Sequence, residues 1–487
     1  MPIRWRDEDP GLPIYFGQCS NGEYDPEPVS RTRRDAELMA RSGVDEAVAR
    51  SGMGRREFLR SACAVAICLT AIDSAVARAG GTPAGLFYPF DPASRHDTDA
   101  ARALIEAPRF VFDVQGHLLE YDIDPSTRGD WFWGRQFPQA RCDDEDDPRA
   151  CFSTNHFLEE IFIRSDTTMV ALSGLPINPE GSPLSNEVME ETRRLVMALS
   201  GDERVVVNAL ALPQTAPVQS VFDEMERTVA EHRVAGWKTF THFPPGMPWR
   251  LDDADGALPA VGHRFLDHLV SIGTPVLFVH KGLSNQNRHG SPADVGPAAK
   301  THPDVSFVVY HSGFEVRQRE GPYTLDTAQT GVNRLVTSVS EAGIGPGGNV
   351  YAELGSTWWH LLRRPDEAAH VIGKLLVAFG EDNILWGTDS IFYGSPQGQI
   401  EAFRAFQIPV DMRERFGYPE LTTRVKEKVL GWNAARLYGI EPITEPVGFS
   451  RDDLAEARRQ HPVPTRVWGP ATTEEVRELR EHHQGWP

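Results

Sequence analysis

Polar residues that can bind a metal or move a proton recur at one kind of position in this sequence, directly after a short apolar run. These residues are Gln115, His117, Ser173, Lys238, His242, His280, His311, Glu353 and Asp389. Imidazole nitrogens and carboxylate oxygens are the usual ligands of zinc and related divalent metals. A buried histidine or aspartate without a partner costs several kcal/mol. The convergence of several such residues on one place therefore predicts a metal site.

Eight apolar runs precede these residues and are typical of parallel strands that are buried on both faces. The runs span residues 109–117, 167–176, 204–213, 235–243, 274–282, 306–313, 349–356 and 383–390. Helical patterns lie between them at 186–199, 217–232, 262–272, 327–342, 366–380 and 395–407. Eight such units predict an α/β fold of the (β/α)8 TIM-barrel type, whose active site lies at the carboxyl ends of the strands. A doubly wound sheet is the alternative.

We expect three regions along the chain. An N-terminal extension occupies residues 1–80, the barrel domain residues 108–440, and a C-terminal extension residues 441–487. A long loop, residues 118–166, follows the first strand, and the C-terminal extension contains one predicted helix at 470–482.

The N-terminal extension contains an arginine pair in the stretch GRREFLR, residues 54–60, followed by a mildly apolar run. Together, residues 54–79 resemble a twin-arginine export signal. The apolar run contains Asp73 and is too short to anchor the chain stably in a membrane. We therefore expect a periplasmic or exported protein that meets the twin-arginine export machinery. The alternative is an ordinary helix that follows a chance arginine pair.

The net charge of the chain indicates which partners it can bind, and the positions of its cysteines indicate a candidate disulfide. The 487 residues include 49 basic and 69 acidic side chains, a formal net charge of −20. Nucleic acid is excluded as the main partner, because phosphate binding requires a basic surface. We expect a small-molecule substrate, and a homodimer is a candidate assembly. Cys142 and Cys151 flank an acidic loop and are a candidate disulfide in an oxidising compartment, with two free thiols as the alternative.

The motifs FDVQGH, VLFVHKG, VVYHSGF, LWGTDS and KVLGWNAARLYGI resemble the amidohydrolase superfamily over about residues 108–440. Within it they are similar to the amidohydrolase-related branch that contains aminocarboxymuconate semialdehyde decarboxylase and resorcylate decarboxylases. The resemblance implies one divalent metal, zinc first and manganese or iron as alternatives, held by His117, His280 and Asp389. It also implies that Asp389 shuttles the proton and that His311 orients the water or the substrate.

The sequence departs from the family pattern at Gln115, where the first strand of the family usually carries a histidine or, in the decarboxylases, a glutamate. The carbonyl oxygen of a glutamine is neutral and a poor zinc ligand beside imidazole. If Gln115 binds, Asp389 is the only charged ligand; if it does not, three protein ligands remain and leave open positions. A site that has lost its metal is a further alternative. Lys238 as a carboxylated bridge between two metals is the least favoured reading.

Candidate substrate contacts surround this set. They are Lys238, His242, Glu315, Glu353, Trp131 and Trp133. The two tryptophans belong to the stretch DWFWGRQF, residues 130–137, which is either an aromatic wall of the site or a small core beneath the long loop.

Three functions are compatible with these residues. The first is metal-dependent hydrolysis of an amide, a lactone or a similar carbon–heteroatom bond in a small, aromatic or apolar substrate. The second is metal-dependent, non-oxidative decarboxylation of an aromatic or unsaturated acid. The third is a catalytically inactive binding protein on the same barrel.

Overall fold

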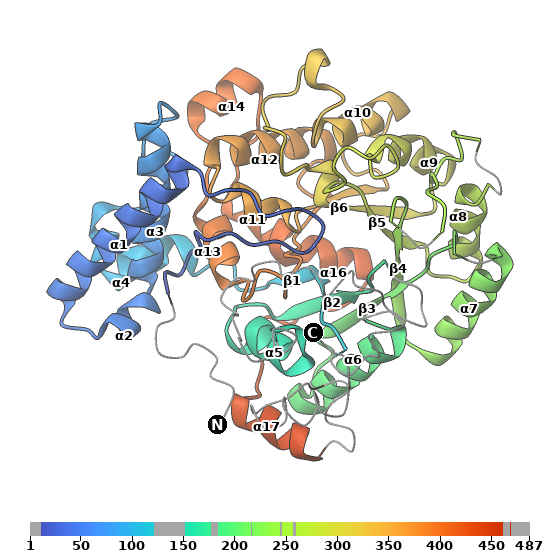
Figure 1. Cartoon of the computed structure of the whole chain (residues 1–487), viewed down its shortest axis with the longest axis horizontal. Helices are drawn as coiled ribbons and strands as arrows, with labels where there is room; N and C mark the ends of the chain where they lie inside the picture. Colours follow the sequence, from blue (N-terminus) through green and yellow to red (C-terminus); the bar gives the residue numbers. More distant parts are fainter. Residues whose placement is uncertain are drawn as a thin grey trace.

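The computed structural model describes residues 11–120, 151–176, 184–215, 217–243, 246–256, 260–460 and 468. At its centre lies a single sheet of eight parallel strands in sequential order (Figure 1). The strands are β1 (Phe112–Gly116), β2 (Met169–Ser173), β3 (Val205–Leu210), β4 (Val234–Phe240), β5 (Val276–His280), β6 (Ser306–Tyr310), β7 (Val350–Glu353) and β8 (Ile384–Leu385). Each strand falls within or overlaps one of the eight predicted runs, which confirms the TIM-barrel prediction.

The barrel closes between β1 and the chain that follows β8. Backbone hydrogen bonds join Val114 N to Trp386 O at 3.0 Å and His117 N to Ser390 O at 2.7 Å. The Asp113 carboxylate, at the start of the first motif, accepts the backbone N–H groups of Gln115 and Thr388, both at 3.0 Å. Asp113 thereby ties together the two strand ends that carry Gln115 and Asp389.

Helices surround the strands (Figure 1). Those of the barrel are α5 (Thr154–Leu158), α6 (Asn186–Ser200), α7 (Val218–Glu231), α8 (Gly262–Ser271), α9 (Val295–Thr301), α10 (Asn333–Ala342), α11 (Thr357–Leu361), α12 (Pro365–Phe379), α13 (Gln397–Ala405), α14 (Val410–Phe416), α15 (Thr423–Glu427) and α16 (Asn433–Tyr438). The predicted helix at 327–342 begins only at Asn333, because Gly331 has a φ of 47° that a helix does not allow. The short helix α9, between β5 and β6, was not predicted.

The N-terminal region is a group of packed helices. They are α1 (Arg31–Ser51), α2 (Arg55–Leu59), α3 (Ala62–Arg78) and α4 (Thr98–Ile105), and they lie beside α13 (Figure 1). Twelve of the 17 residues of α3 are buried. No described helix is long and apolar enough to cross a membrane. Export through the arginine pair remains a prediction.

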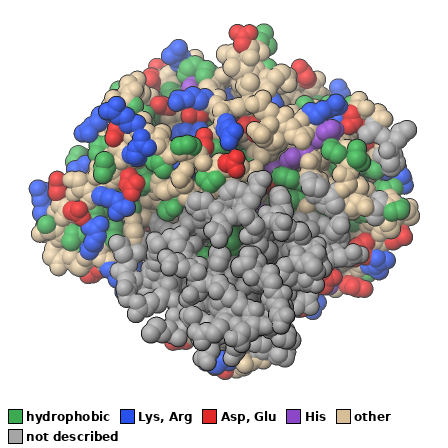
Figure 2. Space-filling view, viewed as in Figure 1, with side chains coloured by type: hydrophobic (Ala, Val, Ile, Leu, Met, Phe, Trp, Pro, Cys, Tyr) green, Lys and Arg blue, Asp and Glu red, His purple; other side chains and the backbone are tan. Residues whose placement is uncertain are grey.

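The C-terminal extension contains α17 (Arg451–Gln460), which was not predicted, whereas the predicted helix at 470–482 lies outside the described residues. Trp131, Trp133 and Cys142 also lie outside them. Cys151 is described and is disulfide-bonded. On the face drawn in Figure 2, Lys and Arg side chains of the described residues are mixed with Asp and Glu.

Candidate metal centre and active site

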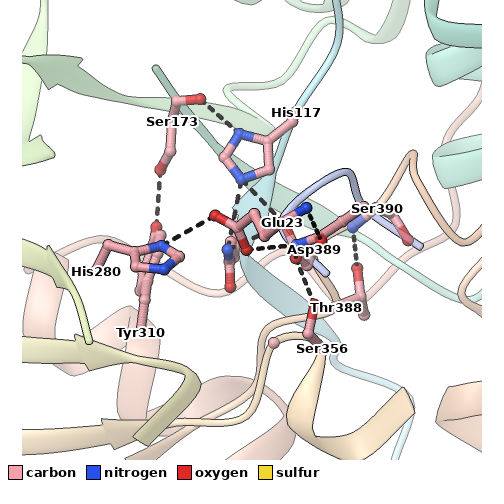
Figure 3. Close-up of polar contacts among 12 residues, drawn as sticks. Glu23, His117, Ser173, His280, Tyr310, Ser356, Thr388, Asp389 and Ser390 are labelled. Carbon is pink, nitrogen blue, oxygen red and sulfur yellow. Dashed lines mark hydrogen bonds and ion pairs between the residues drawn. The ribbon is translucent and has the colours of Figure 1, made fainter. Parts of the chain in front are cut away.

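Three buried histidines, His117, His280 and His311, share one hydrogen-bonding pattern at the carboxyl ends of the strands. Figure 3 shows His117 and its contact with Ser173. Each ring places one nitrogen against a backbone carbonyl: His117 Nδ1 on Ser173 O at 2.7 Å, His280 Nε2 on Gly282 O at 3.1 Å, and His311 Nδ1 on Gly355 O at 2.8 Å. A carbonyl only accepts hydrogen bonds, so these nitrogens carry the protons. The opposite nitrogens, His117 Nε2, His280 Nδ1 and His311 Nε2, therefore present lone pairs, which is the usual arrangement of metal-binding histidines.

Two of the predicted catalytic residues have strained backbones. His311 has a φ of 64° and Asp389 a φ of 60°, in the left-handed region that non-glycine residues rarely adopt. Ser312 and Ser356, which flank the same site, share this feature with φ values of 50° and 55°. Such strain persists where the surrounding structure enforces it, and it concentrates at functional sites. The backbone is thus arranged to aim the His311 and Asp389 side chains.

One group of potential ligands joins two predicted residues to one that was not predicted. Glu23 Oε1 lies 3.4 Å from His280 Nδ1, and His280 Nδ1 lies 3.3 Å from His311 Nε2. One ligand atom from each of these three residues lies within 4.8 Å of the other two. Glu23 belongs to the segment before α1, and no motif or apolar run marked it in the sequence.

A second group contains His117, Asp389 and Gln115. His117 Nε2 lies 3.3 Å from Asp389 Oδ1. The Gln115 amide nitrogen donates to Asp389 Oδ1 at 3.1 Å and lies 3.5 Å from His117 Nε2. Gln115 Oε1 is buried and accepts no hydrogen bond from the residues that the structure describes. The predicted ligands thus meet at one end of the barrel but divide into two neighbouring groups. Asn21 links these groups, because its amide nitrogen contacts Glu23 Oε2 at 2.6 Å and Asp389 Oδ2 at 2.8 Å.

The residues present fit a divalent metal. Bonds of about 2.1 Å at tetrahedral angles separate neighbouring ligand atoms by about 3.4 Å. The separations Glu23–His280, His280–His311 and His117–Asp389 are 3.3 to 3.4 Å. Imidazole and carboxylate donors together suit zinc, manganese or iron.

Burial sets the charge states of the site. Burial lowers the pKa of His311 to about 4 and that of His280 well below its ordinary value, so both rings are neutral at pH 7 and keep their lone pairs. Burial alone would raise the pKa of Asp389, but its contacts with His117 and the Ser356 hydroxyl hold it below its usual range. Asp389 is therefore an anion, as a ligand or a proton acceptor must be.

Two predicted substrate contacts, Lys238 and His242, lie in the same site. The Lys238 ammonium lies 3.7 Å from the centre of the Tyr310 ring and has no hydrogen-bond partner among the described residues. Burial lowers its pKa to about 7. Within the described part of the chain, neither nitrogen of His242 has a hydrogen-bond partner, and the centre of its ring lies 5.2 Å from that of His280. Buried polar groups normally have partners, so these nitrogens are available to a bound molecule.

Glu353 and Glu315 have partners within the protein. Glu353 Oε2 accepts the backbone N–H of His311 at 3.0 Å, and burial raises the Glu353 pKa to about 8. Glu353 therefore orients His311. Glu315 accepts Ser284 Oγ–H at 2.6 Å and Arg334 at 2.9 Å. These contacts account for the burial of Glu315 without a substrate.

Comparisons with solved structures found only distant similarity. A proposed 2-pyrone-4,6-dicarboxylic acid hydrolase from Pseudomonas putida is 15% identical, with 69% of this chain and 99% of that chain covered and a TM-score of 0.38. A 2,6-dihydroxybenzoate decarboxylase from Rhizobium is 13% identical, with coverage of 68% and 98% and a TM-score of 0.39. A manganese-bound 5-carboxyvanillate decarboxylase from Novosphingobium aromaticivorans is 14% identical, with coverage of 68% and 97% and a TM-score of 0.40.

These sequence identities and TM-scores are too low to assign a reaction to this chain. No curated protein matches the chain. A family model does: the amidohydrolase model matches residues 184–440, more than half of the chain, and includes the strand ends that carry Lys238, His280, His311 and Asp389. The chain belongs to the amidohydrolase family.

Proposed function

We propose that the protein is a metal-dependent hydrolase that cleaves a carbon–heteroatom bond, such as an amide or a lactone, in a small carboxylic acid. The observation that carries this proposal is that three imidazole lone pairs and two carboxylates lie in two neighbouring groups at one buried end of the barrel. His117, His280, His311 and Asp389 are the residues that would hold the metal. A bound divalent metal supplies two things in such a site: it lowers the pKa of water and it polarises a carbonyl group.

The chain's own residues supply the proton transfer. Asp389 is ionised and accepts hydrogen bonds from the Ser356 hydroxyl and the Asn21 amide, which fix the direction of its carboxylate. A carboxylate held in this way accepts the proton of an attacking water and returns it to the leaving group. Glu353 holds the backbone of His311, whose free nitrogen would bind the metal and so fix it beside the water or the substrate.

The unpartnered nitrogens indicate the substrate class. Lys238 Nζ lies over the Tyr310 ring, and the His242 ring lies beside that of His280. Their unpartnered nitrogens match a carboxylate on the substrate. Phe240 and Phe243 pack against the His280 ring, with centroids at 5.2 and 5.4 Å, and form an aromatic wall on the same side. A small acid with a flat, apolar body suits these surroundings.

Decarboxylation of such an acid is the second candidate. The exposed fractions of Gln115, His117, His280, His311 and Asp389 are all 2% or less. A site so closed to water suits a reaction in which water is not a reactant. In hydrolysis, Lys238 would bind a substrate carboxylate that does not react. In decarboxylation, Lys238 would face the carboxylate that leaves as CO2.

One assay separates the candidates. Metal-loaded protein is incubated with a panel of lactones, amides and hydroxybenzoic acids, and both CO2 release and bond cleavage are measured. Cleavage of a lactone or amide without CO2 supports hydrolysis. CO2 release from a hydroxybenzoic acid supports decarboxylation. Binding of panel members without any turnover would contradict both and leave the binding protein.

A further inference from the structure

The chain that precedes α1 docks across the mouth of the barrel (Figure 1). Its residues Leu12, Ile14 and Phe16 are buried. Arg363 donates to the Tyr15 carbonyl at 3.0 Å, and Tyr15 stacks on Trp359 with centroids 6.0 Å apart. We call residues 11–30 the N-terminal strap.

Further contacts hold the strap next to the site. The Tyr24 hydroxyl lies 3.1 Å from that of Tyr393, and the Tyr24 ring packs edge-on against His360. Arg364 donates to Glu27 at 3.1 Å. Asn21 and Glu23 lie between Tyr15 and Tyr24 in the sequence, so the strap is anchored on both sides of them. These anchors fix the two polar residues over the strand ends.

The Glu23 side chain points into the site rather than out of it. Its carboxylate lies between His280 and Asp389 (Figure 3), and its side chain is 12% exposed. Neither histidine near it offers an N–H, since the protons of His280 and His311 lie on the nitrogens that face backbone carbonyls. Two lone pairs and an acidic side chain thus face one another, an arrangement that only a cation or a proton between them stabilises.

The Glu23 carboxylate supplies a charged donor that Gln115, on β1, lacks. Gln115 is a neutral amide at a position where a stronger donor would complete the ligand set, and its amide nitrogen, rather than its oxygen, faces Asp389. The barrel strands alone therefore supply Asp389 as the only carboxylate among the candidate ligands. Glu23 adds a second carboxylate at 3.4 Å from His280 Nδ1, the separation that ligands of one metal have.

We propose that Glu23 is a metal ligand, delivered by the N-terminal strap, which together with His280 and His311 completes the site in place of Gln115. This proposal rests on the proposed metal-dependent function. It implies that the site binds metal tightly only while the strap is docked, so the N-terminal region is part of the active site.

The test compares metal affinity in full-length variants. Glu23→Gln keeps the size of the side chain and removes its charge. Asp25→Asn is the matched control, because Asp25 lies two residues away on the same strap, is exposed, and has only a loose ion pair with Arg317 at 3.7 Å. The dissociation constant for Zn2+ is measured by competition with a chromophoric chelator. We expect a weakening of at least about tenfold in Glu23→Gln and no change in Asp25→Asn.

A spectrum separates ligation from a merely structural role. The visible absorption of Co2+ reports its ligands, so the bands of Co2+-loaded Glu23→Gln should shift relative to wild type, and those of Asp25→Asn should not. Gln115→Glu introduced into the Glu23→Gln protein should restore at least part of the lost affinity, because it returns a carboxylate to the site. Rescue by this second change also shows that the Glu23→Gln protein is folded.

The outcomes distinguish this proposal from the proposed function. Wild-type protein that binds one metal, with a Glu23→Gln variant of equal affinity and identical Co2+ bands, overturns the role of Glu23 and leaves the metal-dependent function intact. Wild-type protein that binds no metal overturns both.

Discussion

Asp389 combines three properties that a proton-transfer residue needs. It is buried, it is ionised, and its backbone is held at a φ of 60° by the structure around it. Its two oxygens face His117 and Gln115 on one side, and Asn21 and Ser356 on the other. Both carboxylate oxygens of Asp389 are therefore held in place by residues of the site.

Asp389→Asn keeps the shape of this side chain but removes its ability to accept a proton. We expect turnover to fall by about 10²- to 10⁴-fold, the usual contribution of general acid–base catalysis. The measurement is kcat on whichever substrate the panel identifies, with the exposed Asp411→Asn on α14 as the control. Activity within about twofold of wild type would remove Asp389 from the mechanism.

Gln115→His tests the neutral ligand position directly. An imidazole nitrogen binds zinc more strongly than an amide oxygen does, so metal affinity should rise by about tenfold or more. A chelator competition assay measures the affinity, and Gln219→His, on the exposed face of α7, is the control. Equal affinities in all three proteins would mean that the side chain at position 115 does not reach the metal.

The residues that sequence reasoning could identify are those that follow strands. His117, His280, His311 and Asp389 end apolar runs, and parallel strands of a barrel all point their carboxyl ends to one mouth. Glu23 and Asn21 could not be identified in this way. They lie in a strap without regular secondary structure, and their place depends on side-chain packing over hundreds of residues of separation.

At the scale of elements, helix α3 shows that an apolar run alone does not predict whether a segment is an export signal or a buried helix. An export signal and a buried helix both require a run of apolar residues, and the sequence alone does not separate them. In the structure α3 packs against α1, α4 and α13, and its Asp73 accepts the backbone N–H groups of Gly85, Phe87 and Tyr88 at 3.0 to 3.3 Å. The aspartate that interrupts the run thus has a structural partner.

Asp73 also predicts a pH effect on stability. Burial raises its pKa from 3.8 to about 6, so the folded protein binds the proton more tightly than the unfolded chain does. Its stabilising contribution is complete below about pH 4 and is lost as the pH rises through 6, by roughly 3 kcal/mol. Asp73→Asn keeps an acceptor oxygen and cannot ionise, so it should lack this loss.

Thermal midpoints at pH 4.5 and 7.5, in excess chelator, measure the effect. The difference in thermal midpoint, Asp73→Asn minus wild type, should be larger at pH 7.5 than at pH 4.5. Asp73→Ala, which removes the acceptor for three N–H groups, should be less stable than Asp73→Asn at both. Parallel behaviour of wild type and Asp73→Asn would show that Asp73 does not titrate in this range.

At the scale of the whole molecule, the N-terminal region has two proposed tasks. We propose that Arg55 and Arg56, which are exposed, direct export, while α3 and the strap complete the folded enzyme. Joint replacement of Arg55 and Arg56 by lysine should move the protein from the periplasm to the cytoplasm, as cell fractionation and immunoblotting would show. An unchanged distribution would mean that the arginine pair is not an export signal.

Retention of the strap can be tested separately. Because α3 is buried and Glu23 reaches the site, we expect the working protein to keep residues 11–79. The intact mass of active protein from its native host measures this directly. A mass that corresponds to cleavage at the end of the predicted signal, residues 54–79, would mean that the active protein lacks Glu23 and would contradict the role of Glu23 as a ligand.

The measurement that tests the central claim most directly is the metal content of full-length protein purified without chelator, by plasma mass spectrometry. Three lone-pair histidines and two carboxylates in one buried site predict about one zinc, manganese or iron per chain. About two metals per chain would revive Lys238 as a bridge between them. No bound metal, even after reloading with each of the three ions, would contradict metal-dependent catalysis by this protein.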